Sequence, residues 1–505
     1  MTAKPLMVQG TMSGVGKSLL VAGLCRVLAQ DGYRVAPFKS QNMALNSAVT
    51  AEGLEIGRAQ AMQAEAAGID PTAAMNPVLL KPTTDTGSQV IVDGRPIGTM
   101  PAREYFAFRH KLREHIQAAY QRLTAEYDMV LIEGAGSPVE LNLLRDDIVN
   151  MGVAKMCASP VLLVGDIDKG GVFAQLIGTM MLLPDDERSM VKASVVNKFR
   201  GDSSLFDEGV AILRERMGVP VAGVVPYLQV DLDDEDSVSS RLAVRQRTSA
   251  VDVAVIRLPK ISNFTDFIAL DVCEGMGVRY VSSPDELGRP DLLIVPGSKA
   301  TIADLLWMRE RGLEDVVQKA VRSGVPVLGI CGGYQMLGLS IADPLGMEGG
   351  GEVAGMGLLP VRTVFGKDKH QVRTTAQFCD VQGALAPLSG AQAYGYEIHM
   401  GTTTLEGGAP LLKTVDSAGS VRNDGCQCGS VYGCYLHGLF DSAEVVQALL
   451  AGLLEAKGIE LSGRQSPHAQ DMRAYRQAQY DALADGLRAS LDMNLVYHII
   501  EKGLR

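Results

Sequence analysis

Two stretches of this 505-residue chain have the spacing of reactive sites, and the first is rich in glycine. Residues 10–18 read GTMSGVGKS and follow a short apolar run. A loop of this kind at a helix N-terminus binds phosphate, because its backbone N–H groups point at the anion. We predict that Gly14, Gly16 and Lys17 bind ATP and that Ser18 binds both ATP and Mg²⁺. The loop is a variant, because it has one residue more between its outer glycines than the common pattern.

The second stretch surrounds a cysteine. Residues 329–335 read GICGGYQ and follow an apolar run, so Cys331 is placed at a sharp turn from strand to helix. A cysteine in that position suits nucleophilic attack on an acyl group. We predict that the backbone N–H groups of Gly332 and Gly297 stabilise an oxyanion. The base should be a histidine, and we predict His437, with His399 as the alternative.

Acidic and amide side chains follow other apolar runs. Glu133 follows residues 129–132, and Asp166 and Asp168 follow residues 161–164. The carboxyl ends of parallel strands face the ligand crevice of an α/β sheet. We therefore predict that Glu133 and Asp166 join Ser18 at the Mg²⁺ ion. Asn197, which ends a further run, is predicted to bind the ATP base. Helix capping is the alternative interpretation of these side chains.

A polar stretch follows the second predicted strand. Residues 39–47 read KSQNMALNS and are rich in amide and hydroxyl groups but poor in charge. Such groups suit a polar substrate that carries carboxylates and carboxamides. We predict substrate binding by Lys39, Ser40, Gln41, Asn42 and Asn46, with an ordinary polar loop as the alternative.

Alternating strands and helices are expected to position these residues. Apolar runs alternate with helical periodicity, which predicts two α/β domains with doubly wound parallel sheets. We expect an ATP-dependent domain at residues 1–226, an acidic linker at 227–250, a second domain at 251–445 and a helical extension at 446–505. The predicted strands are residues 6–9, 34–38, 129–132, 161–164, 193–196, 221–224, 251–256, 278–281, 292–295 and 325–330, with a helix at 18–29.

Composition excludes several classes of function. The formal net charge of −11 argues against general binding to nucleic acids or anionic membranes. No apolar run is long enough to span a bilayer. The eight cysteines are irregularly spaced, which is not typical of a disulfide framework and favours the cytoplasm. Cys426, Cys428 and Cys434 cluster, but we interpret them as loop thiols rather than a metal site.

The cysteine motif resembles the nucleophile signature of class I glutamine amidotransferases of the triad type. In that family the motif ends in glutamine, here Gln335, which the resemblance implies in glutamine binding. The usual histidine–x–glutamate is missing, because Gly438 and Leu439 follow His437. A Cys331–His437 pair is therefore implied, without a known group to orient the histidine.

The N-terminal half resembles the dethiobiotin synthetase-like P-loop fold. The two halves in this order are similar to the cobyric acid synthases of cobalamin biosynthesis. The resemblance implies that ATP and Mg²⁺ activate the b, d, e and g carboxylates of (adenosyl)cobyrinic acid a,c-diamide, a corrinoid. Ammonia released from glutamine at Cys331 would then convert each carboxylate to an amide.

Three rival interpretations remain. An a,c-diamide synthase acting on the same corrin is disfavoured by residues 40–47, which that group lacks. An amidase–ligase acting on a cell-wall precursor is disfavoured by the fusion of both halves in one chain. A non-enzymatic ATP switch shares the variant phosphate loop but gives no reason for the turn at Cys331.

Overall fold

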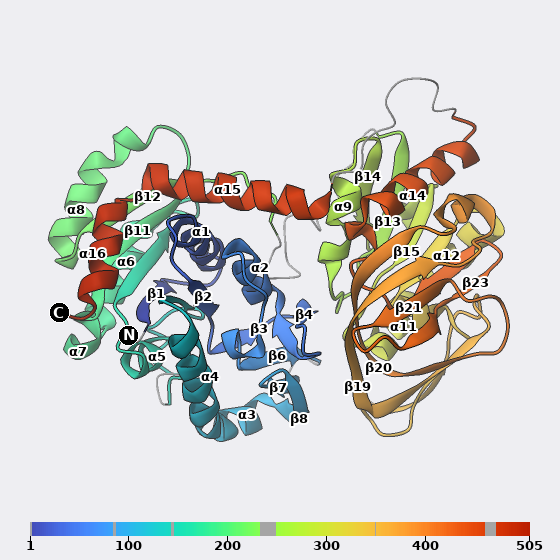
Figure 1. Ribbon diagram of the computed structural model, residues 1–505, viewed down its shortest axis with the longest axis horizontal. Coiled ribbons are helices and arrows are strands. Elements are labelled where there is room, and N and C mark those ends of the chain that lie inside the picture. The colour runs from blue at the N-terminus through green and yellow to red at the C-terminus, as the bar shows by residue number, and fades with distance from the viewer. Residues whose placement is uncertain (1–2, 84–86, 143–145, 233–248, 349, 460–470) are drawn as a thin grey trace.

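Two lobes, each built on a six-stranded sheet, make up the molecule (Figure 1). The computed structural model describes residues 3–83, 87–142, 146–232, 249–348, 350–459 and 471–505. The expected α/β class with two parallel sheets is confirmed, and each predicted strand overlaps an observed one. Most of the acidic linker lies outside the described residues. No helix among the described residues is long and apolar enough to cross a membrane.

The first sheet is entirely parallel and runs in the order β12-β11-β10-β1-β9-β2. Its strands are apolar because both faces are covered. Leu6 and Val8 belong to one hydrophobic cluster and Met7 belongs to another. The strands are β1 (Lys4–Gly10), β2 (Val35–Phe38), β9 (Met129–Glu133), β10 (Val161–Asp166), β11 (Val191–Phe199) and β12 (Val221–Pro226).

Helices and two small sheets surround this core. The helices are α1 (Lys17–Gln30), α2 (Arg58–Ala66), α3 (Ala102–Phe108), α4 (Arg113–Glu126), α5 (Met151–Met156), α6 (Val172–Leu182), α7 (Asp185–Arg188) and α8 (Asp207–Met217). One small sheet pairs β3 (Gln41–Met43), β6 (Val78–Pro82), β7 (Gly87–Val92) and β8 (Arg95–Pro101). The other is a hairpin of β4 (Ser47–Val49) and β5 (Glu55–Gly57).

The second lobe has a similar central sheet in the order β14-β13-β15-β16-β24-β23, with only β23 antiparallel. Its strands are β13 (Val251–Ile256), β14 (Met276–Val281), β15 (Leu292–Val295), β16 (Val327–Ile330), β23 (Cys426–Cys428) and β24 (Val431–Cys434). The helices around it are α9 (Ile268–Asp271), α10 (Pro284–Leu287), α11 (Thr301–Glu310), α12 (Leu313–Arg322), α13 (Gly332–Leu337) and α14 (Ala443–Ala456). The three clustered cysteines lie in β23 and β24 rather than in a loop, which corrects our interpretation.

A long, mainly antiparallel sheet covers the side of the second lobe that faces the first. It consists of β17 (Ser340–Asp343), β18 (Gly351–Ala354), β19 (Val361–Phe378), β20 (Gln392–Leu405), β21 (Leu412–Asp416) and β22 (Val421–Asp424). Strands β19 and β20 form its longest pair and extend towards the β4–β5 hairpin of the first lobe (Figure 1). This sheet was not predicted.

The C-terminal helices return to the first lobe. Helix α15 (Met472–Ser490) begins beside the second lobe and crosses to the first, where α16 (Met493–Lys502) follows (Figure 1). Leu487 packs against α1, where a Cβ on Gly23 would lie 2.4 Å from its Cδ1. Arg26 pairs with Asp481 at 2.8 Å. The last helices therefore belong to the core of the first lobe.

We expect Leu487→Ala to lower the free energy of unfolding of the first lobe by about 2–5 kcal/mol, because it opens a cavity in a buried cluster. Asp485→Ala, at an exposed position of the same helix, is the matched control. Urea unfolding of the full chain measures both. Equal stability of the two variants would show that α15 does not support this core.

Candidate active site

The phosphate loop has the backbone that its glycines predict. Gly14 and Gly16 adopt left-handed φ values of 73° and 93°. A Cβ on Gly16 would lie 2.4 Å from Asn197 Nδ2, and that amide donates to Val15 O at 2.7 Å. The Asn197 side chain therefore packs against the phosphate loop. Its contact with the ATP base stays a prediction.

Lys17, Ser18 and Glu133 meet beside this loop. Lys17 Nζ donates to Met12 O at 3.0 Å and to Gly136 O at 3.2 Å, so it lies within the cradle. Ser18 Oγ donates to Glu133 Oε1 at 2.9 Å. A hydroxyl and a carboxylate this close are the hard oxygen ligands that Mg²⁺ prefers. The residues present therefore fit the metal.

Asp166, the predicted third ligand of Mg²⁺, and its neighbour Asp168 differ in position. Asp166 is buried at the end of β10 and pairs with Lys198 Nζ at 3.1 Å, and Lys198 also donates to Gly14 O at 2.5 Å. Asp166 is therefore linked to the phosphate loop through a lysine. Asp168 instead pairs with Arg200 at 2.5 Å on the surface.

The predicted substrate stretch is largely buried and leads from Glu133 to the other lobe. Lys39 Nζ binds Glu133 Oε1 at 2.7 Å. Asn42 Nδ2 donates to Gln60 Oε1 at 2.9 Å, and Ser40 Oγ donates to the Ile148 carbonyl at 2.6 Å. Gln41 accepts from Tyr105 OH at 2.5 Å. Asn46 Oδ1 accepts from Asn263 N of the second lobe at 2.8 Å.

The cysteine motif forms a strained turn between β16 and α13. Cys331 has φ 51° and ψ −108°, an uncommon backbone for a residue with a side chain. A Cβ on Gly333 would lie 1.9 Å from Val295 O, so only glycine fits there. The thiol is buried and donates to the Ile398 carbonyl at 3.7 Å. The turn thus holds the cysteine at the carboxyl edge of the sheet.

His437 lies at the same edge and is oriented by an aspartate. Its Nδ1 is 2.7 Å from Asp266 Oδ2, and Gly438 N donates to Asp266 Oδ1 at 3.2 Å. Tyr396 stacks on the ring, with centroids 5.5 Å apart. The other nitrogen, Nε2, is buried and has no hydrogen-bond partner within the described part of the chain. It is available for proton exchange with a thiol.

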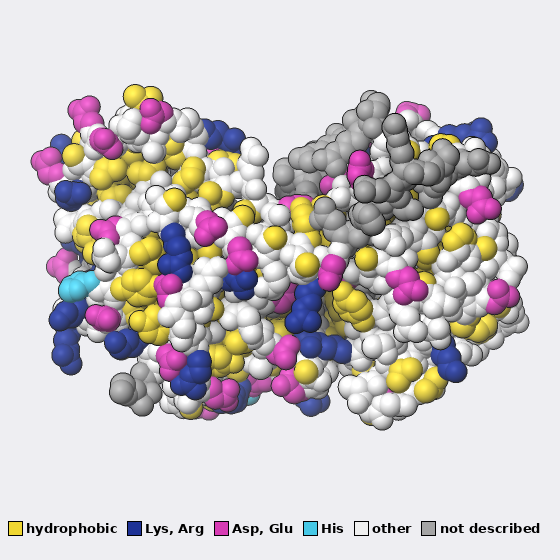
Figure 2. Space-filling view, turned by 45° about the horizontal axis from the view of Figure 1, so that its top comes forward, with side chains coloured by type: hydrophobic (Ala, Val, Ile, Leu, Met, Phe, Trp, Pro, Cys, Tyr) yellow, Lys and Arg dark blue, Asp and Glu magenta, His cyan; other side chains and the backbone are white. Residues whose placement is uncertain are grey.

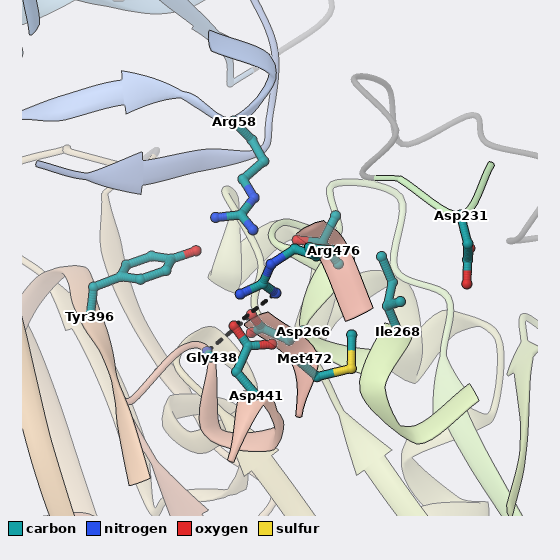
Figure 3. A pocket seen from close by; sticks show the side chains of 10 residues that line it. Arg58, Asp231, Asp266, Ile268, Tyr396, Gly438, Asp441, Met472 and Arg476 are labelled. Atoms are coloured by element: carbon teal, nitrogen blue, oxygen red, sulfur yellow. Dashed lines mark hydrogen bonds and ion pairs between the residues drawn. The ribbon is translucent and has the colours of Figure 1, made fainter. Parts of the chain in front are cut away.

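Asp266 was not predicted from the sequence. It lies 171 residues before His437, in a short 3-10 helix (Phe264–Phe267) that follows β13, and no motif connects the two. Its position past the end of a parallel strand is the one signal that could have found it. Asp266 lines a pocket between the lobes together with Arg58 of the first lobe, Tyr396 and Arg476 (Figure 3).

Charge around His437 changes its protonation. Burial favours the neutral ring, but Asp266 first and Cys331 second outweigh burial and raise the pKa of His437 to about 10. The ring is then an imidazolium at neutral pH. An imidazolium beside a cysteine stabilises the reactive thiolate.

His399 has different surroundings. Its ring stacks on Tyr435 with centroids 3.6 Å apart, and Nε2 is 3.7 Å from Glu397 Oε2. His370 Nε2 is 3.5 Å from the same oxygen, and the three ligand atoms lie within 4.8 Å of one another. Arg422 also binds Glu397, at 2.5 Å. This geometry favours His437 over His399 as the base.

The remaining predicted residues gather around Cys331. A Cβ on Gly332 would lie 2.8 Å from Ser298 N, and a Cβ on Gly297 would lie 3.2 Å from His437 Cε1. Gln335 Nε2 donates to Met400 O at 3.1 Å and to Tyr435 OH at 3.0 Å. Both glycine turns therefore border the thiol and the imidazole, and the oxyanion and glutamine-binding roles stay predictions.

Known families match both lobes. A model of the CobQ/CobB/MinD/ParA nucleotide binding domain matches residues 6–237, and one of the CobB/CobQ-like glutamine amidotransferase domain matches residues 252–445. A cobyric acid synthase of Ruminiclostridium cellulolyticum is 54% identical over 99% of this chain and 98% of its own length. The chain belongs to the cobyric acid synthase family.

Other curated members of this family match over similar lengths. The cobyric acid synthase of Lachnoclostridium phytofermentans is 50% identical over 99% of this chain and all of its own length. That of Citrobacter koseri is 49% identical over 98% of both chains. The protein is therefore an enzyme that joins a nucleotide-binding domain to a glutamine amidotransferase domain.

We expect Asp266→Asn to lower the glutaminase kcat roughly a hundredfold to ten-thousandfold, because the imidazole loses the charge that orients it. His399→Ala should lower it much less. Release of glutamate from glutamine measures both variants. A larger loss of glutaminase activity in His399→Ala than in Asp266→Asn would show that His399, and not His437, is the base.

We expect His437 to titrate near pH 10 in the wild type and about 1–3 pH units lower in Asp266→Asn. The pKa of His437 is higher in the folded protein than in the unfolded chain, so its ion pair with Asp266 stabilises the fold. This stabilisation is complete below about pH 6.5 and is lost as the pH rises through about 10. Histidine NMR signals across this range measure the titration, with His437→Gln for assignment. A wild-type pKa near 6.5 would contradict the ion pair.

Proposed function

We propose that this enzyme amidates the b, d, e and g carboxylates of (adenosyl)cobyrinic acid a,c-diamide with ammonia taken from glutamine, forming (adenosyl)cobyric acid. One observation carries the proposal. A single chain contains a phosphate loop with an adjacent carboxylate in one lobe and a cysteine–histidine–aspartate site in the other, and the two lobes share a packed interface. The full-length likeness to curated cobyric acid synthases supports this substrate. Because ATP and glutamine are cytoplasmic metabolites, we also propose a cytoplasmic enzyme.

The second lobe would release ammonia. The Cys331 thiolate attacks the side-chain carbonyl carbon of glutamine, and the N–H groups of Gly332 and Gly297 stabilise the oxyanion. The His437 imidazolium gives a proton to the departing nitrogen, so ammonia leaves and a glutamyl thioester remains. Neutral His437 then takes a proton from water, which hydrolyses the thioester to glutamate. Asp266 holds the ring throughout.

The first lobe would use that ammonia. A substrate carboxylate oxygen attacks the γ-phosphorus of ATP, ADP leaves, and an acyl phosphate forms. Ammonia then attacks the acyl carbon and the bond to the phosphate oxygen breaks, which gives the carboxamide and phosphate. Lys17 offsets the negative charge of the transferred group. Ser18 and Glu133, with Asp166 nearby, would hold Mg²⁺, which supplies further charge neutralisation when bound.

The substrate would bind along residues 39–46. Lys39 already contacts Glu133, so this stretch begins at the acyl-phosphate site. Its buried amides offer both donors and acceptors for the carboxamides and carboxylates at the corrin edge. Asn46, at its far end, contacts the amidotransferase lobe.

The test is conversion of purified cobyrinic acid a,c-diamide with ATP and glutamine, followed by mass spectrometry. Four successive carboxylate-to-amide exchanges are the expected result. No conversion with active glutaminase and ATPase would retain the amidotransferase chemistry and reject the corrinoid substrate. Conversion of cobyrinic acid itself at two carboxylates would favour the a,c-diamide synthase.

We expect Cys331→Ser to lower glutamine-dependent amidation on the order of 10⁴-fold while ammonium-dependent amidation continues, because only the nucleophile is lost. Lys17→Ala should block amidation from both nitrogen sources. Cys428→Ser, at an exposed cysteine, is the control. Loss of both reactions in Cys331→Ser would contradict two separate sites.

A further inference from the structure

A buried cluster of three charges joins the two lobes. Glu55 of β5 is fully buried; its Oε1 accepts from Lys81 at 2.9 Å and its Oε2 from Lys369 at 2.5 Å. Lys81 belongs to the first lobe and Lys369 to the second. Gln371 donates to Glu55 Oε2 at 3.0 Å, and Ser47 accepts from Lys81 at 2.9 Å. Both carboxylate oxygens of Glu55 are therefore hydrogen-bonded, one to the first lobe and one to the second.

Stability alone does not explain these charges. Removing ions from water costs several kcal/mol each, and apolar residues of similar size are often at least as stabilising. The two ammonium groups outweigh burial and hold the pKa of Glu55 well below its usual range. Two lysines face one carboxylate, so the cluster carries excess positive charge whenever both lysines are protonated.

The cluster borders the cavity that contains the nucleophile. A cavity of about 40 Å³ is lined by Cys331, Gln335 and His399, and also by Lys81 and Lys369. A water molecule requires roughly 10–15 Å³ of such space, and ammonia is of similar size. Ammonia freed at Cys331 therefore meets Lys81, the lining residue that comes from the first lobe.

Buried polar side chains continue from the cluster towards the phosphate loop. A Cβ on Gly57, two residues after Glu55 in β5, would lie 2.8 Å from both Asn42 Nδ2 and Gln60 Oε1. Gln60 Nε2 in turn lies 3.4 Å from Glu133 Oε2. A buried polar seam thus connects the cluster to the site where we propose that the acyl phosphate forms.

We propose that Glu55, Lys81 and Lys369 form the gate through which ammonia passes from the amidotransferase lobe to the synthetase lobe. This inference rests on the proposed function. While Lys369 is protonated, the excess positive charge repels ammonium, which lacks the lone pair needed to attack an acyl phosphate, and neutral ammonia passes. The Glu55 carboxylate keeps the two lysines together.

Lys369 is suited to move within such a gate. Burial lowers its pKa to about 7, although Glu55 opposes this effect. A lysine that is only partly charged at neutral pH can release its ion pair while Lys81 stays bound to Glu55.

The test follows the origin of the amide nitrogen. The full-length enzyme receives ATP, the corrinoid diamide, unlabelled glutamine and ¹⁵N-ammonium, and mass spectrometry measures ¹⁵N in the product. We expect the wild type to use glutamine nitrogen and to release one glutamate per amide. In Lys369→Met, which leaves the balanced Lys81–Glu55 pair, we expect several glutamates per amide and a severalfold higher ¹⁵N fraction.

Two further variants complete the test. Glu55→Gln should also uncouple glutamine hydrolysis from amide formation. If Glu55→Gln does not fold, the result for Lys369→Met alone tests the gate. Arg373→Ala removes another contact between the lobes, the hydrogen bond to Val49 O at 2.7 Å, and should behave as the wild type. The gate would be contradicted if the gate variants released one glutamate per amide and gave product with the wild-type ¹⁵N content. Equal uncoupling in Arg373→Ala would also contradict it. No amidation by the wild type from either nitrogen source would contradict the proposed function itself.

Discussion

The contact between the β4–β5 hairpin and the β19–β20 pair is the constraint on which the rest of the molecule depends. Under the proposed function, ammonia released in one lobe reaches the other without loss to bulk water only if the two lobes are held in a fixed relation. The hairpin supplies that relation through backbone and side-chain hydrogen bonds. Tyr396, which stacks on His437, also donates to Ser47 O at 3.1 Å, so one side chain contacts both the His437 imidazole and the opposite lobe.

Much of the fold could be predicted from the sequence because its strongest signals are local. Buried parallel strands are continuous apolar runs, and glycine-rich turns follow them at residues 10–18 and 329–335. The side chains just beyond those runs, such as Ser18, Glu133 and Cys331, therefore fell at the correct edge of each sheet. The proximity of Ser18 and Glu133 follows from the pairing of β1 with β9.

What could not be predicted depends on contacts between distant segments. Asp266 and His437 meet only because two neighbouring loops converge, and neither loop has a distinctive motif. Strands β19 and β20 do not alternate polar and apolar residues regularly along their whole length. Different parts of these strands face solvent, the hydrophobic core of the second lobe and the first lobe. The role of α15 was equally hidden, because helical periodicity reveals a buried face but not the partner that covers it.

The path of the chain has a consequence for biosynthesis. The first lobe begins at β1 but is completed by α15 and α16, after the whole second lobe has been made. Leu491, Val496 and Ile500 fill the same cluster as Leu6 and Val8. During translation the nascent N-terminal sheet therefore has α1 on this face, but part of the face stays uncovered until α15 and α16 leave the ribosome. A chain that stops before these helices exposes apolar surface to chaperones and proteases.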